Sequence, residues 1–336
     1  MERIEDKQSI RTKYLIDLKD YQRGKYLNHG SYGDVAKIIN KTTKEEYAAK
    51  FIHEIEGEYT KLTINREIGI MIRLQHPTLI RFVGYSLKDF EDQECVVIIM
   101  EYAKNGSLAS VLEKNRIEKP NVLINNTTRQ KILIGISYAM MYLHRNRVIH
   151  RDLKPHNVVL DEFYHPHLTD FGASKFTRPG HTLEQTGQIG TCVYMAPEVM
   201  EDSIFDIKAD VYSFCIIMYE IITGKSAFGH LGKISGFNFS KKIIEGVRPL
   251  IKKGAIKQKG LRVMMKMCWD KNPSKRPSFS EIFKKLSLST NDFLLGFENN
   301  PEKEIINVNE KDSEDDQAEI EFEEKKIEDM KKKEKI

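Results

Sequence analysis

Two features in the first third of the chain could bind an anionic group. The first is Gly30-Ser31-Tyr32-Gly33-Asp34-Val35, where glycines would let the backbone approach phosphate oxygens without a side chain in between. The second is Lys50, which ends the run Ala48-Ala49-Lys50 where a β-strand would direct it inward. A buried lysine needs an anionic partner, and Glu67 is placed to supply one. Taken alone, these residues also fit an ordinary hairpin turn and a surface ion pair.

A second group of polar residues lies in the middle of the chain. It begins with His150-Arg151-Asp152-Leu153-Lys154-Pro155-His156-Asn157, and Asp170-Phe171-Gly172 follows 13 residues after Asn157. Ala196-Pro197-Glu198 comes 26 residues after Asp170. Each aspartate alone could be a turn or capping residue. Together with the glycine-containing loop and Lys50, these three motifs make five within about 170 residues. Five motifs in this order do not arise by chance.

The order of these motifs resembles the eukaryotic protein kinase family. The chain contains H-R-D-L-x-x-x-N, D-F-G and A-P-E in sequence, with the glycine loop and the lysine upstream. The resemblance covers residues 20–288. It implies a bilobal α+β fold, with a small β-rich N-lobe that contains one helix and a large, mainly helical C-lobe.

The resemblance implies a catalytic set of six residues: Lys50, Glu67, Asp152, Lys154, Asn157 and Asp170. Phosphoryl transfer needs a donor held in line with the acceptor and a neutralised phosphate charge. Asp152 would accept or orient the proton of the substrate hydroxyl. Asp170 and Asn157 offer hard oxygen ligands for Mg²⁺, with Mn²⁺ as an alternative, on the phosphates of ATP. Lys50 would bind the α- and β-phosphates, and Glu67 would hold Lys50.

The resemblance also implies an ATP pocket formed by Leu27, Asn28, Gly30, Ser31, Tyr32, Gly33, Val35, Ala48, Lys50, Met100, Glu101, Ala103 and Val159. Met100 would be the gatekeeper that narrows the pocket. Glu101 and Ala103 would belong to the hinge whose backbone pairs with adenine, above Val159 as the floor. The family's first loop glycine is Asn28 here, a residue type that tolerates positive φ better than most.

The same resemblance indicates the acceptor and the group within the family. Lys154, two residues after Asp152, and Thr191 are typical of Ser/Thr kinases. Asn105-Gly106-Ser107-Leu108 and Tyr194-Met195-Ala196-Pro197-Glu198 resemble the tyrosine-kinase-like (TKL) group, which mostly modifies Ser and Thr. We therefore expect a TKL-type Ser/Thr kinase with protein substrates.

Regulation is expected in the segment between Asp170 and Glu198. In the family, an arginine at the position of Arg151 commonly meets a phosphate on this segment. We therefore predict phosphorylation at Thr182 or Thr186, by an upstream kinase or by self-association and autophosphorylation in trans. Glu198 and Arg276 resemble the ion pair that braces the segment.

Hydrophobic patterns indicate the elements that must position these residues. We expect an antiparallel meander over 21–51, a helix over 58–74, strands over 79–86 and 94–102, a helix over 126–147 and a buried helix over 210–224. The expected division is an N-terminal extension at 1–20, a kinase domain at 21–288 and a charged tail at 289–336. The N-lobe would span 21–103 and the C-lobe 104–288.

Composition excludes several other classes of protein. The 336 residues carry a net charge of +4, which gives no bias toward nucleic acid. Residues 301–336 hold 14 acidic and 8 basic side chains, so the basic excess belongs to the rest of the chain. The apolar runs fall short of the ~18 residues that cross a bilayer. The four cysteines are widely spaced, and we expect a cytoplasmic protein that binds no membrane.

Three alternatives remain at this point. A pseudokinase would use the same shape to scaffold signalling partners, but Lys50, Glu67, Asp152, Asn157 and Asp170 are all present. A dual-specificity or tyrosine kinase would differ only in its acceptor. A kinase of small molecules is disfavoured by the full segment that ends in Ala196-Pro197-Glu198.

Overall fold

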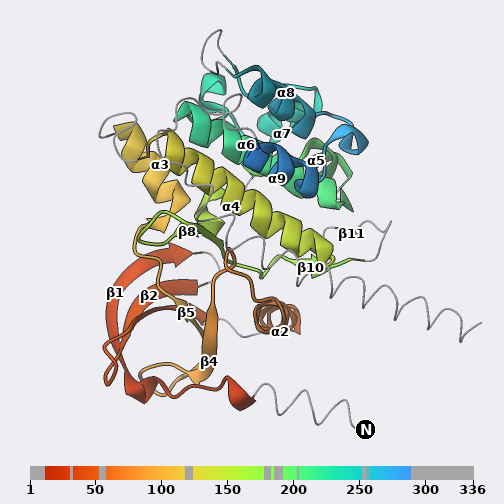
Figure 1. The fold of residues 1–336 in the computed structure, drawn as a ribbon. Helices are drawn as coiled ribbons and strands as arrows, with labels where there is room; N and C mark the ends of the chain where they lie inside the picture. The colour runs from red at the N-terminus through yellow and green to blue at the C-terminus, as the bar shows by residue number, and fades with distance from the viewer. Residues whose placement is uncertain are drawn as a thin grey trace, which may run out of the picture. The chain divides into compact units, whose positions relative to one another are not determined.

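The computed structural model describes residues 12–30, 33–52, 58–117, 124–177, 183–184, 192–202, 204–251, 256 and 258–288. The N-terminal part is an antiparallel five-stranded sheet with the strand order β1-β2-β3-β5-β4. Its strands are β1 (Tyr21–Gly30), β2 (Gly33–Asn40), β3 (Glu46–Ile52), β4 (Phe82–Lys88) and β5 (Glu94–Glu101). Helix α2 (Glu58–Arg73) lies beside this sheet (Figure 1).

Alternation along the strands divides the sheet into two faces. Ala36, Ala49, Phe51, Val97 and Ile99 belong to a buried core on one face. Their neighbours in sequence must therefore point to the other face, where the register aligns Val35 with Lys50 and Ala48 with Met100. The expected meander is confirmed, and it orders the residues proposed to bind the nucleotide.

The segment before β1 packs against the edge of the sheet. Ile16 N donates to Tyr85 O at 2.8 Å, and Tyr85 N donates to Tyr14 O at 2.9 Å. Leu18, in a short 3-10 turn at Leu18–Asp20, is 3% exposed and joins the core. Residues 12–20, which we call the strap, are thus part of the packed sheet.

The C-terminal part is mainly helical. Its helices are α3 (Leu108–Ile117), α4 (Asn126–Arg145), α5 (Pro197–Asp202), α6 (Ile207–Thr223), α7 (Gly236–Ile244), α8 (Lys259–Cys268) and α9 (Phe279–Leu288). The expected buried helix is confirmed as α6, while α4 lies between the sheet and helices α5 to α9 in Figure 1. None of the helices in the described ranges is long and apolar enough to cross a membrane. The bilobal α+β fold is therefore as expected.

Short strands and turns connect these helices. The strands are β6 (Gly106–Ser107), β7 (Val148–Ile149), β8 (Val158–Leu160), β9 (Pro166–Leu168), β10 (Lys175–Phe176), β11 (Leu183–Glu184) and β12 (Ile204–Phe205). β6, β8 and β9 form a three-stranded sheet. β4 begins at Phe82 rather than near Leu79, because Ile80 N donates to Leu168 O at 2.8 Å and ties this stretch to β9.

Candidate active site

A lysine from the sheet and two carboxylates form the centre of the site. Lys50 Nζ on β3 lies 2.8 and 3.1 Å from the two carboxylate oxygens of Glu67 on α2. The same nitrogen lies 2.9 Å from Oδ1 of Asp170, which is 120 residues away in sequence. The structure therefore brings together three of the predicted residues from both lobes.

Burial and charge act against each other in this cluster. Burial disfavours the ammonium of Lys50, but Glu67 and Asp170 outweigh this and hold its pKa above the usual value. Burial likewise raises the pKa of Glu67, and Lys50 only partly offsets the rise. For Asp170 burial is outweighed by the attraction of Lys50, so its pKa is lowered. The cluster thus holds an ionised Asp170 carboxylate beside a fully charged lysine.

Asp152 is held by the side chains of Lys154 and Asn157. Lys154 Nζ lies 2.6 Å from Asp152 Oδ2. Asn157 Nδ2 donates to the carbonyl oxygen of Asp152 at 2.8 Å and to Oδ2 at 3.0 Å. The turn Pro155–Asn157 is a 3-10 helix with proline at its start, which suits a residue without an N–H. Asp152 is therefore fixed in position as a hydrogen-bond acceptor.

Asp210 on α6 supports the loop that carries Asp152. Its Oδ2 accepts from His150 N at 2.9 Å, and its Oδ1 accepts from Arg151 N at 3.0 Å. A third contact is made by His144, whose Nε2 lies 2.9 Å from Oδ2. Arg151 has φ 69°, a left-handed conformation that a non-glycine residue adopts at a cost. Because Asp210 accepts hydrogen bonds from the backbone N–H groups of both His150 and Arg151, it holds this strained turn in place.

Asp210 and His144 were not among the predicted site residues. The available signal was an acidic side chain within a mostly apolar helix, and such a charge has to be paired when the helix is buried. Asp210 is 1% exposed. Burial would raise its pKa, but the contacts with His144 and His150 lower it, so the carboxylate stays ionised.

The donor set suits a hard divalent cation that is shared with phosphate. Asp170 supplies a carboxylate, and the Nδ2 contacts of Asn157 leave its amide oxygen for another partner. Thr169 N donates to Asn157 O at 3.0 Å, so the segments that carry the two donors are adjacent. The described residues contain no cluster of three or more His, Cys, Asp or Glu side chains that could hold a metal alone. Phosphate and water oxygens would have to complete an octahedral site.

The first strands of the sheet carry most of the residues predicted for the nucleotide. Asn28 on β1 is paired with Val35 on β2. Gly33 has φ 132°, and a Cβ there would lie 1.9 Å from the carbonyl oxygen of Phe51. Glycine is therefore required at this position by the backbone itself, in addition to any approach of phosphate.

The other predicted residues lie on or next to strands of the two lobes or outside the described residues. Ala48 and Met100 are buried and paired across β3 and β5. Glu101 ends β5, and Val159 lies half-buried on β8. Leu27 and Gly30 belong to β1, whereas Ala103 follows β5. The residues outside the described ranges are Ser31, Tyr32, Thr182, Thr186 and Thr191.

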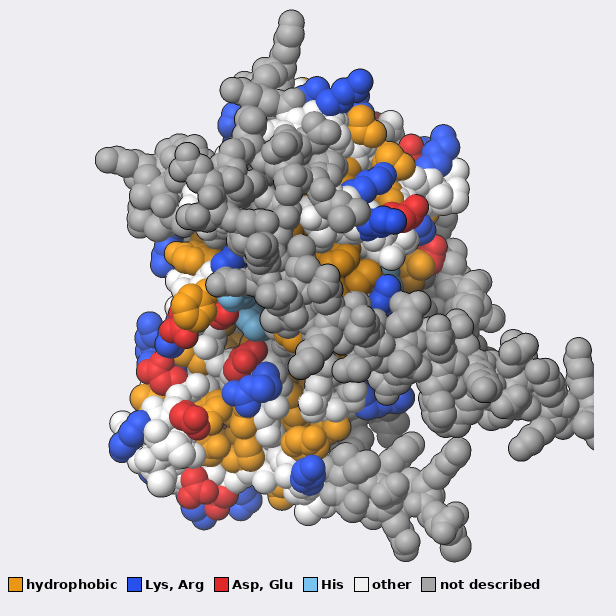
Figure 2. Space-filling model, in the orientation of Figure 1, with side chains coloured by type: hydrophobic (Ala, Val, Ile, Leu, Met, Phe, Trp, Pro, Cys, Tyr) orange, Lys and Arg blue, Asp and Glu red, His pale blue; other side chains and the backbone are white. Residues whose placement is uncertain are grey.

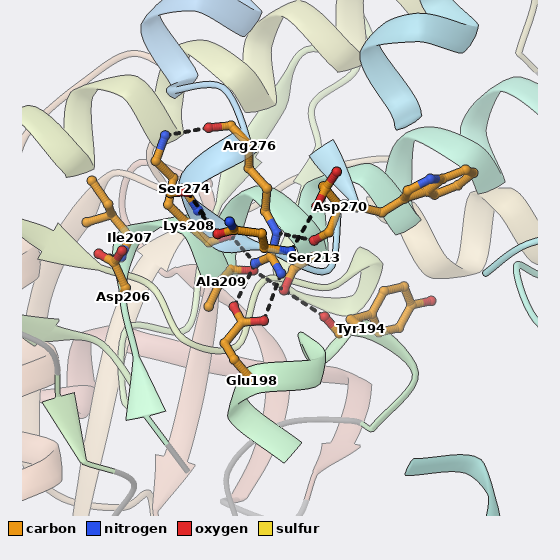
Figure 3. A network of polar contacts seen from close by, with 12 residues as sticks. Tyr194, Glu198, Asp206, Ile207, Lys208, Ala209, Ser213, Asp270, Ser274 and Arg276 are labelled. Atoms are coloured by element: carbon orange, nitrogen blue, oxygen red, sulfur yellow. Dashed lines mark hydrogen bonds and ion pairs between the residues drawn. The ribbon is translucent and has the colours of Figure 1, made fainter. Parts of the chain in front are cut away.

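Figure 3 shows the polar network at the end of the segment that follows Asp170. Arg276 NH1 and NH2 donate to the two carboxylate oxygens of Glu198 at 2.6 and 2.7 Å. Arg276 is 1% exposed and also donates to Asp270 O and to Lys208 O, each at 3.0 Å. Ser213 on α6 donates to Tyr194 O at 2.7 Å. The expected brace between Glu198 and Arg276 is present.

Lys50 on the five-stranded sheet is paired with Glu67 on helix α2 and contacts Asp170, which lies on the helical lobe together with Asp152 and Asn157. This combination is typical of a protein kinase. Residues 21–286 match the protein kinase domain family, and the chain belongs to this family. The resemblance seen in the motifs is thus confirmed. Membership of this family generally implies the use of ATP and a divalent metal ion.

The chain is also similar to individual kinases. It is 31% identical over 277 residues to dual specificity protein kinase shkB of Dictyostelium discoideum, a match that covers 80% of this chain and 40% of the relative. It is 30% identical over 275 residues to serine/threonine-protein kinase VIK of Arabidopsis thaliana, with 80% and 59% covered. For serine/threonine-protein kinase STY17 of the same plant the identity is 29% over 278 residues, with 82% and 45% covered. The chain therefore spans less than two thirds of the length of these relatives.

Proposed function

We propose that this chain is an ATP-dependent protein kinase of the TKL type that phosphorylates Ser and Thr hydroxyls. The observation that carries the proposal is the contact of Lys50 with both Glu67 and Asp170. This contact couples a phosphate-binding cation on the sheet to a metal-binding carboxylate on the other lobe. A scaffold that never binds nucleotide would have no need to hold these three ionisable side chains together, with Lys50 and Glu67 largely removed from solvent at a cost in desolvation.

Each residue has a defined part in this reaction. Lys50 binds the α- and β-phosphates, with Glu67 to orient it, and Asp170 and Asn157 hold Mg²⁺ (Mn²⁺ is the alternative). The metal ion, when bound, offsets the charge that develops on the phosphates. Asp152 accepts or orients the proton of the attacking hydroxyl, and Lys154 contacts the γ-phosphate.

The nucleotide site itself is part of the proposal. Leu27, Val35 and Ala48 form its roof, and Val159 forms its floor. Backbone groups at Glu101 and Ala103 bind adenine, with Met100 behind the base. The glycine loop contributes Asn28, Gly30, Ser31, Tyr32 and Gly33.

The domain organisation follows the same proposal. The catalytic unit spans 21–288, divided after residue 103 into N-lobe and C-lobe, with 1–20 and 289–336 as flanking segments. A cytoplasmic location agrees with the free thiols of Cys95, Cys192, Cys215 and Cys268.

Regulation through the segment after Asp170 is proposed for Arg151. Its NH1 donates to Ala173 O at 3.4 Å. The pKa of Lys175 is lowered, mainly by burial and further by the positive charge of Arg151. Two cations close to the start of the segment favour a phosphate on Thr182 or Thr186. An upstream kinase or a second copy of the chain would supply this phosphate.

The test is phosphate transfer by the purified chain. Labelled ATP, Mg²⁺ and a general protein substrate are incubated with the wild type and with Asp152→Asn and Lys50→Met. Transfer by the wild type alone supports the proposal, and its absence at high enzyme concentration would refute it. Phosphoamino-acid analysis then separates Ser/Thr from Tyr as acceptor, and a Thr182→Ala/Thr186→Ala double variant with full activity would exclude the regulatory sites.

A further inference from the structure

β9 leads directly to Asp170 and contacts the end of β5 through alternate side chains. His167 Nδ1 lies 3.3 Å from Glu101 Oε1, and Thr169 Oγ1 lies 3.8 Å from Met100 Sδ. Leu168, between them, is fully buried on the opposite face. Glu101 and Met100, the last two residues of β5, are thus contacted by His167 and Thr169, which come shortly before Asp170 in the sequence.

The imidazole of His167 lies between two carboxylates from different parts of the fold. Its Nε2 is 3.8 Å from Oδ2 of Asp161, in the turn between β8 and β9. Its Nδ1 is buried and makes no hydrogen bond within the described part of the chain, so its contact with Glu101 is an ion pair when the ring is protonated. Histidine side chains lie beside acidic ones where the sheet and the helical lobe meet (Figure 2). A protonated imidazole here attracts both carboxylates.

Both carboxylates are fixed by other contacts. Glu101 Oε1 accepts from Arg81 N at 3.0 Å, and Arg81 Nε lies 3.7 Å from Oε2. Asp161 Oδ1 accepts from Phe163 N and from His165 N, each at 2.8 Å, and Oδ2 lies 2.9 Å from His165 Nδ1. His167 therefore connects one rigid acceptor of the N-lobe with one of the C-lobe.

The position of His167 in the sheet relates this link to the nucleotide site. His167 is paired with Val159 across β8 and β9, so the two side chains share a face. We propose that His167 is a positioning residue for nucleotide binding, which acts through Glu101 to hold the hinge against the strand pair that carries Val159. The inference rests on the proposed function, because the roles of Glu101 and Val159 are part of it.

The experiment measures the Kd of ATP with Mg²⁺ by direct titration, together with KM and kcat. His167→Leu should raise Kd and the KM for ATP about threefold to fivefold, the range of a partly exposed ion pair. Because the variant leaves the contacts of Asp152 intact, kcat should change less than about twofold. His167→Lys should restore wild-type affinity through its permanent charge, and His167→Gln should fall between Lys and Leu.

Two controls separate this role from general stability. His165→Leu removes the other imidazole of the same turn, which does not contact Glu101, and should leave Kd unchanged. In a Glu101→Gln background, His167→Leu should have little further effect, because the partner charge is gone.

Three results would overturn the inference: an unchanged Kd in His167→Leu, an equal loss in His165→Leu, or an undiminished effect in the Glu101→Gln background. If His167→Leu does not fold, His167→Gln decides by the same criteria. Failure of the wild type to bind ATP overturns the proposed function and this inference with it, whereas normal wild-type binding with an unaffected variant overturns the inference alone.

Discussion

The substitution Asp210→Asn removes the negative charge that supports the loop carrying Asp152 and keeps nearly the same side-chain shape. In the wild type, one carboxylate oxygen accepts from Arg151 N and the other from His150 N and His144. An asparagine has a single acceptor oxygen, so its NH₂ group must face one of the two backbone N–H groups. Either orientation leaves one buried N–H without an acceptor.

The cost follows from these contacts. A hydrogen bond to a charged acceptor contributes about 1.5–3 kcal/mol, and an unsatisfied buried donor costs about 1–3 kcal/mol. Since the substitution weakens the remaining bonds as well, we expect a loss of about 2–4 kcal/mol in the free energy of unfolding. Displacement of the strained turn at Arg151 also moves Asp152, and misplacement by ~1 Å can lower kcat about a hundredfold.

The assay combines urea unfolding with steady-state kinetics. Asp206→Asn is the matched control, because Asp206 caps the same helix by accepting from Ile207 N at 2.5 Å. Asparagine caps a helix about as well as aspartate, so this variant should change neither stability nor kcat. The KM for ATP should change little in Asp210→Asn, since Lys50 and the hinge are contributed by the sheet.

The reasoning is wrong if Asp210→Asn behaves like Asp206→Asn. It is also wrong if stability falls by the expected amount while kcat stays at the wild-type value, because the loop would then not depend on Asp210 for its position.

Three further predictions concern the N-lobe and its junction. In Gly33→Ala, the new Cβ would lie 1.9 Å from Phe51 O, in a positive-φ conformation. Thermal unfolding should show a loss of stability, and steady-state kinetics should show a rise of about tenfold in the KM for ATP. In Gly84→Ala, the Cβ would lie 2.4 Å from Ile16 Cδ1 and should displace the strap. The free energy of unfolding should fall by about 1–3 kcal/mol, and an unchanged midpoint of urea unfolding would contradict this prediction. Burial lowers the pKa of His76 to about 4, against ~6.5 when unfolded, so the unfolded state takes up the proton first as pH falls. The free energy of unfolding should drop by up to about 3 kcal/mol between pH ~6.5 and ~4, and His76→Phe should lack this part of the drop in pH-dependent urea unfolding.

The sequence predicted the elements that have clear periodicity. The meander, α2, α4 and α6 occur where the apolar spacing indicated, because alternation and helical stripes report which face is buried. The start of β4 was placed too early. Its expected first residues, Leu79 and Ile80, are apolar like a strand, but their backbone pairs with β9 of the other lobe, and such a partner has no local signal.

The packing of residues 12–20 against the sheet shows the same limit. Residues 12–20 are mixed in composition and carry no strand pattern that stands out. Their packing depends on a glycine 68 residues after Ile16, at Gly84, where the absent Cβ leaves room for the Ile16 side chain. Only the folded chain brings the two together.

The residues proposed for the catalytic chemistry were named from the sequence alone. Lys50, Glu67, Asp152, Asn157 and Asp170 could be named from the types and order of the motifs, because phosphoryl transfer demands those groups. The tertiary structure decided how they are held. The sequence assigned no role at the site to Asp210 or His167, and the roles inferred for them follow from contacts across 59 to 66 residues of sequence separation. Burial makes unpaired charges costly, so such contacts form wherever the fold supplies a partner, and the linear sequence does not show where that is.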